Sequence, residues 1–145
     1  SQSKAKDKGD EEAMGVNGYS EEDWKDAKSL KEAMTLYSMK TPNAVFFAHN
    51  VTFDWSFTNE AFRITGVRNS MDYHRLDLYT LAWFTLRETK IKGFNLNKIA
   101  EFLGAGKEPD PHRAINGART AYEVLRKLLV WKENNTLIEN GWRKE

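Results

Sequence analysis

Three polar side chains, His49, Asn50 and Asp54, follow a short apolar run in the sequence AVFFAHNVTFD. The apolar run predicts a strand over Ala44–His49 that is buried on both faces. A helical pattern follows, and Asp54 falls in the helix's first turn, where the helix dipole favours an anion. Because ligands bind at the carboxyl ends of strands in open α/β sheets, a carboxylate is expected at such an edge. The alternative interpretation is that Asp54 is only a helix-start acid.

A second group of polar residues opens the last predicted helix, in the sequence PHRAINGARTAY. His112 lies near the start of that helix, and Gly117 follows five residues later. An imidazole can accept a proton from water near neutral pH. The alternative interpretation of His112 is a buried or capping residue.

The apolar periodicity around these groups predicts a helix-rich α/β chain. Its main helices are expected at about Ser20–Met39, Phe53–Thr65, Tyr79–Glu88, Leu96–Leu103 and His112–Lys132. A second short strand is expected over Tyr73–Leu78, with Asp77 as a strand-end or helix-start acid. The expected caps are Thr52, Asn95, Gly104 and Asp110. Each helix carries one apolar stripe that we expect to be buried. The positions are Trp24, Ala27, Leu30, Met34 and Tyr37 in the first helix, Phe53, Phe57, Ala61 and Ile64 in the second, and Ile115, Ala118, Tyr122, Leu125 and Leu129 in the last.

Both polar groups resemble motifs of the DEDD-type 3′–5′ exonucleases that contain a histidine, a family with an RNase H-like fold. AHNVTFD resembles the second motif, and PHRAINGA, preceded by NLNKIAEFLG, resembles the third. The resemblance implies that Asp54 binds catalytic metal, that His112 takes a proton from the attacking water, and that His49, Asn50 and Phe53 shape the substrate pocket. It also implies two Mg²⁺ or Mn²⁺ ions as cofactors, and the 3′ end of a DNA or RNA single strand as the substrate.

The chain departs from the family pattern at two places. The family's first motif, D-x-E on an apolar strand, is absent, because Asp10 and Glu12 have that spacing but lie in a polar run. Gly117 stands where the family has the third-motif aspartate. One matched carboxylate leaves most of a metal ion's coordination shell to water, so we expect weak or no metal binding and impaired hydrolysis. We also expect the fold to tolerate Gly117→Asp.

The missing first motif leaves three explanations open. The chain is a piece of a longer protein, or a partner completes its sheet, including a second copy in a homodimer, or it is a degenerate relative that has repacked. Without the family's N-terminal strands, the strand at Ala44–Ala48 would be an exposed apolar edge.

The composition limits the function classes. A chain of 145 residues with 40% hydrophobic residues can form one core, so we expect a mobile tail at 1–12 and an incomplete exonuclease-like domain at 13–145. The formal net charge of +1 lacks the basic excess typical of general nucleic-acid binders. The absence of cysteine excludes disulfides and thiolate metal sites. With no membrane-length apolar run and no signal peptide, a cytoplasmic location without membrane association is expected.

The leading hypothesis is therefore a 3′–5′ exonuclease-type domain whose catalytic set is incomplete. The main alternative is a nucleic-acid-binding or structural module that uses the same fold without catalysis. A helical interaction domain with an accidental match is the third hypothesis, and it requires Ala44–Ala48 not to be a strand.

Overall fold

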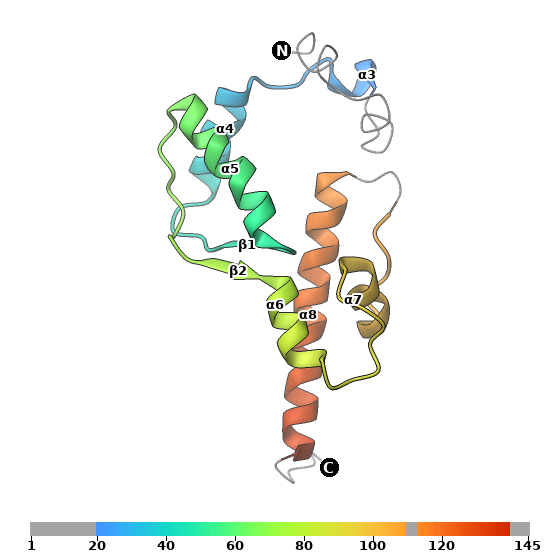
Figure 1. The fold of residues 1–145 in the computed structure, drawn as a ribbon. Coiled ribbons are helices and arrows are strands. Elements are labelled where there is room, and N and C mark those ends of the chain that lie inside the picture. Colours follow the sequence, from blue (N-terminus) through green and yellow to red (C-terminus); the bar gives the residue numbers. More distant parts are fainter. Residues whose placement is uncertain (1–19, 110–112, 140–145) are drawn as a thin grey trace. The chain divides into compact units, whose positions relative to one another are not determined.

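The computed structural model describes residues 20–109 and 113–139, so the expected tail at 1–12 and His112 lie outside the described residues. The described elements follow one another as shown in Figure 1. They are α3 (Glu21–Trp24), α4 (Leu30–Lys40), β1 (Phe46–Ala48), α5 (Val51–Thr65), β2 (Arg75–Asp77), α6 (Leu78–Leu86), α7 (Leu96–Leu103) and α8 (Ala114–Glu139). The chain divides into two compact units. Unit 1 contains α4, α5 and most of the strand pair, and unit 2 contains residues 48–50 with α6, α7 and α8.

The two strands form a parallel pair joined by α5. Just before β1, the Asn43 amide donates to the Ser70 carbonyl at 2.8 Å, and the Asp72 amide donates to the Ala44 carbonyl at 3.0 Å. The bonded residues advance in the same direction along both segments, as parallel pairing requires. Both strands lie inside the ranges expected from the sequence, although each is only three residues long. The expected burial of Ala44–His49 on both faces is wrong, because only Phe46 is buried and Val45 is 48% exposed.

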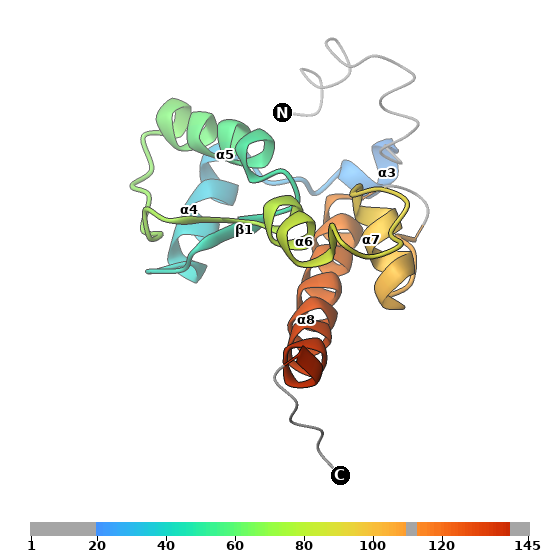
Figure 2. The same cartoon turned by 60° about the horizontal axis from the view of Figure 1, so that its bottom comes forward.

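The core of unit 1 forms where α5 packs on β1 and on α4 (Figure 2). The ring of Phe46 meets the ring of Trp55 edge-on, with 5.2 Å between their centroids. The Arg75 guanidinium carbon lies 3.4 Å from the centroid of Trp55, a cation–π contact that ties β2 to the same helix. Met34 of α4 and Phe62 of α5 complete the buried apolar set of this unit.

The buried face of α5 differs from the one that its periodicity suggested. Phe53, Phe57 and Ile64 are 61%, 65% and 61% exposed, so most of the predicted stripe faces solvent, although Ala61 is half-buried. The helix instead packs Trp55 on Phe46 of β1 and Phe62 near Tyr37 of α4, because two apolar stripes share the helix and only one of them is buried. The expected cap at Thr52 is also wrong, because the helix already begins at Val51.

The helix predicted over Ser20–Met39 is interrupted between α3 and α4. Ser29 begins α4 with a capping box, in which its hydroxyl accepts from the Glu32 amide and the Glu32 carboxylate accepts from the Ser29 amide at 2.9 Å. The Ser29 hydroxyl and amide hold the pKa of Glu32 below its ordinary value. Trp24 and Leu30 are about half exposed, so of the predicted stripe only Met34 is buried and Tyr37 half-buried.

Unit 2 is a three-helix arrangement in which α6 and α7 both pack on α8 (Figure 1). The fully or nearly buried apolar residues are Leu78, Ala82 and Leu86 from α6, Ile99 and Ala100 from α7, and Ala121, Val124 and Leu128 from α8. Helix α7 has the predicted bounds and caps. Asn95 accepts from the Lys98 amide at 2.9 Å, and Gly104 ends the helix with a left-handed φ of 66°.

The long helix α8 differs from its prediction at the start and in its face. It begins at Ala114, with the non-helical Arg113 before it, and the expected cap Asp110 lies outside the described residues. Tyr122 and Leu129, predicted to be core, are 57% and 55% exposed, whereas the neighbouring face with Val124 is buried. In the described part of the chain, no helix combines the length and the apolar character needed to cross a membrane.

Two leucines of unit 2 test this assignment of buried faces. Leu86→Ala removes a side chain that is 0% exposed, and we expect a loss of about 2–5 kcal/mol in the free energy of unfolding. Leu129→Ala makes the same chemical change where the side chain is 55% exposed, and its effect should stay within about 0.5 kcal/mol. Urea unfolding measures both. An equal loss at the two positions would contradict the observed orientation of α8.

Candidate functional site

His49 lies just after β1 and belongs to unit 2, where two neighbouring residues hold its ring in place. Its Nε2 is 2.9 Å from the carbonyl oxygen of Phe94, and its ring meets the ring of Tyr79 edge-on with centroids 6.0 Å apart. Tyr79 in turn contacts the ring of Phe94 at 6.2 Å. A histidine tied to a backbone carbonyl through one nitrogen has a fixed ring orientation, so His49 is positioned rather than mobile.

Asn50 makes the turn that ends the strand and begins α5. Its φ of 64° lies in the left-handed region, which Asn tolerates better than other side chains. The helix starts at the next residue, Val51, and Asp54 falls in its first turn with an exposed side chain. The strand, turn and first-turn carboxylate therefore occur in the order that the sequence predicted.

Phe53 has an exposed side chain, whereas Asp77 has a structural role at the start of α6. Phe53 is 61% exposed, and its ring meets Phe57 edge-on at 5.1 Å, which leaves an aromatic surface beside Asp54 on the same helix. Asp77 caps α6, because its carboxylate accepts from the Thr80 amide at 2.9 Å and from the Thr80 hydroxyl at 2.6 Å. The helix-start interpretation of Asp77 is confirmed.

Gly117, which the resemblance places at the position of the family's third-motif aspartate, lies beside the carboxylate of Glu108. A Cβ built on Gly117 would lie 3.4 Å from Oε1 and 4.0 Å from Oε2 of Glu108. Two long hydrogen bonds fix the loop that carries Glu108: its amide donates to Asn97 Oδ1 at 3.4 Å, and Asn116 Nδ2 donates to the Pro109 carbonyl at 3.3 Å. A carboxylate from the loop therefore occupies the space beside residue 117.

The sequence analysis did not single out two acidic residues, Glu108 and Asp72, that the structure places in close contacts. Glu108 lies in the irregular loop GAGKEPDP, where no periodicity indicates which way a side chain points. Asp72 precedes β2, and its Oδ1 is 2.7 Å from both the amide nitrogen and Nδ1 of His74. The His74 amide, followed by its ring, lowers the pKa of Asp72. The spacing Asp-x-His is the only sequence signal for that pair.

The donor set of the described residues does not fit a site for two divalent ions. Across 20–109 and 113–139, no three His, Asp or Glu side chains gather closely enough to hold a metal ion. Two-ion sites of this chemistry need several carboxylate oxygens. The hydrolytic step that the resemblance implies therefore has no complete ligand set in this part of the chain.

Comparison with known proteins gives two matches. The family model described as "Exonuclease" matches residues 2–125. The chain is also similar to the DNA polymerase III PolC-type of Pediococcus pentosaceus, with 30% identity over 113 residues. That alignment covers 76% of this chain but only 7% of the relative. No solved structure gives a significant match. The RNase H-like α/β class predicted from the sequence is confirmed by the family match.

The contact between residue 117 and Glu108 refines the expectation for Gly117→Asp. A Cβ fits, so Gly117→Ala should raise the free energy of unfolding by roughly 0.5–1 kcal/mol through helix propensity. Gly117→Asp adds a like charge beside Glu108, and it should be less stable than Gly117→Ala by at least about 0.5 kcal/mol at neutral pH. Chemical unfolding of both variants measures the difference.

The control repeats both substitutions, Gly117→Ala and Gly117→Asp, in a protein that also carries Glu108→Gln. There the gap between Gly117→Asp and Gly117→Ala should shrink, because the amide carries no charge. A gap that is unchanged by Glu108→Gln would show that the two positions do not interact.

Proposed function

The chain belongs to the exonuclease family, and on that premise we propose that it is a 3′–5′ exonuclease-type domain that holds the 3′ end of a DNA or RNA single strand. Its hydrolytic activity is impaired in the chain as it stands. By resemblance, Asp54 and His112 are the catalytic residues, and Asp54 is the Mg²⁺ or Mn²⁺ ligand. His49, Asn50 and Phe53 contact the strand end.

The main support for the proposal is the order of structural elements from β1 to Asp54: a strand, a left-handed turn and the start of a helix. A parallel strand ends at Ala48, Asn50 reverses the chain with a φ of 64°, and an exposed carboxylate follows in the first turn of α5. This order supports a ligand site at the carboxyl end of β1. His49, whose ring is held through its Nε2, supplies an oriented imidazole at the same place in the chain.

The PolC-type relative favours DNA as the strand, because its name describes a DNA polymerase. The present chain spans 7% of that relative, so polymerase activity does not transfer with the similarity. The exposed apolar side chains of Phe57 and Ile64 on α5 support completion of the domain by further segments, from a longer chain or from a second copy.

A non-catalytic binding module is the second candidate function. The glycine at residue 117 favours it, because this position supplies no carboxylate for a metal ion. The donor set of the described residues also supports it. Both candidates hold a strand end, and they differ only in whether nucleotides are released.

Recognition of a strand end can be measured by competition between two DNA strands of equal base content. We expect a linear strand with a free 3′-hydroxyl to bind about tenfold more tightly than a circular strand, which has no end. Phe53→Ala should reduce this preference. Ile64→Ala is the control, because Ile64 is also 61% exposed on α5 but lies about three turns further along. Equal affinity for linear and circular strands would contradict the proposal.

The impairment is tested by the release of mononucleotides from a labelled linear strand with Mn²⁺. We expect no more release from the unsubstituted chain than from Asp54→Asn, because one matched carboxylate cannot hold two ions. Release that requires Mn²⁺ and disappears in Asp54→Asn would show a working ligand set and would overturn the proposed impairment.

A further inference from the structure

Helix α6 has two apolar faces, and only one of them is buried. Leu78, Ala82 and Leu86 are 0% exposed and pack in the core of unit 2. Tyr79 and Trp83, each 44% exposed, lie beside this buried face, and Phe84, 67% exposed, lies on the side away from it. Tyr79 and Trp83 are four residues apart, so their rings lie about one helical turn from each other. The helix therefore presents planar aromatic rings to solvent.

Basic side chains adjoin these rings. The guanidinium carbon of Arg87 lies 5.1 Å from the centroid of Trp83 and 5.2 Å from that of Phe84. Residues 87–98 contain four basic residues, Arg87, Lys90, Lys92 and Lys98, against one acidic residue, Glu88. This local excess is hidden in the whole chain, whose formal net charge is only +1.

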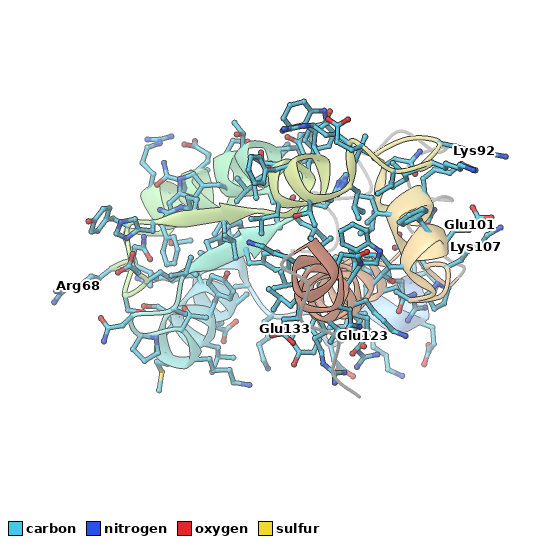
Figure 3. All side chains as sticks on the ribbon, turned by 90° about the horizontal axis from the view of Figure 1, so that it is seen from below. Arg68, Lys92, Glu101, Lys107, Glu123 and Glu133 are labelled. Carbon is cyan, nitrogen blue, oxygen red and sulfur yellow. The ribbon has the colours of Figure 1, made fainter. Side chains whose placement is uncertain are left out.

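A hollow of about 220 Å³ opens among the lysines of this segment. Lys90, Lys92 and Lys98 line it, together with Ile91, Phe102 and one acid, Glu101. Glu101 is 3.5 Å from Lys98 Nζ. Figure 3 shows the Lys92 side chain extending outward from the loop that precedes α7. Lys90 follows Arg87 by three residues, which places their Cα atoms within about 11 Å of each other.

We propose that the outward face of α6 and the loop that follows it bind single-stranded nucleic acid along its length. Bases stack on Trp83 and Phe84, and Tyr79 extends the row of rings. Arg87 and the lysine hollow bind backbone phosphates. Exposed aromatic rings beside a basic groove are how proteins bind single strands without sequence preference. A neutral apolar partner would use the rings but would gain nothing from three lysines around one hollow. This inference takes its ligand class, single-stranded nucleic acid, from the proposed function. It adds a second surface, whose binding does not require a 3′ end.

The decisive probe is circular single-stranded DNA, because any site that requires a 3′ end cannot bind it. We expect Trp83→Ala and Phe84→Ala each to weaken binding of the circle by roughly fivefold to a hundredfold. Phe57→Ala is the matched control. Phe57 is 65% exposed, much like Phe84, but lies on α5 in unit 1, and its loss should leave affinity for the circle unchanged.

The lysines are tested through the salt dependence of the same binding. Each phosphate contact to a single strand contributes a slope of about −0.7 to the plot of log affinity against log salt concentration. Lys90→Gln and Lys92→Gln should each flatten that slope by about this amount. Lys31→Gln, which removes an exposed charge from α4, should not.

Three results would overturn the inference. The circle fails to bind, or Trp83→Ala and Phe84→Ala bind it as well as Phe57→Ala does, or sedimentation shows that the aromatic substitutions dissociate a dimer, which would make this face a protein interface. Equal affinity for linear and circular strands would contradict the proposed function but not this inference, because binding of the circle does not depend on a 3′ end.

Discussion

The left-handed backbone of Asn50 is the constraint on which the turn from β1 to α5 and the candidate site depend. With a φ of 64°, this residue ends β1 and allows α5 to begin at Val51. An ordinary L-residue pays an energetic penalty of about 1–2 kcal/mol for this conformation, whereas Asn visits it routinely. The short turn fixes the rotation of α5. That rotation packs Trp55 on Phe46, and it sets Asp54 in the first turn with its side chain exposed.

The rotation of α5 also explains which parts of the structure could be predicted. Element order, strand positions, the caps of α7 and the helix-start role of Asp77 follow from local signals, and all of these are observed. The buried faces of α5 and α8 do not follow, because each helix carries two apolar stripes. Phe53 and Phe57 compete with Trp55 and Phe62, and Tyr122 competes with Val124. Only tertiary packing decides between such stripes. Likewise, no local pattern could place Glu108 beside Gly117.

The two units contribute different properties to the proposed function. The β1–α5 segment carries the residues that resemble the family's second motif, with an exposed carboxylate in the first turn of α5. Unit 2 presents the aromatic rings and lysines that we propose bind along the length of a nucleic-acid strand. In the part of the chain that the structure describes, no three His, Asp or Glu side chains gather to hold a metal ion, so the function we propose is to hold a nucleic-acid strand.

The most direct test of the account is solution NMR of the segment from Ala44 to Asp54. We predict strong amide-to-preceding-Hα contacts through Phe46–Ala48, and cross-strand contacts between the Ala44 and Asp72 segments. The amide–Hα coupling of Asn50 should report a positive φ, and sequential amide–amide contacts should begin at Val51. Continuous helical contacts from Ala44 through Asp54 would remove the strand and the turn. They would contradict both the family-like site and the function proposed for it.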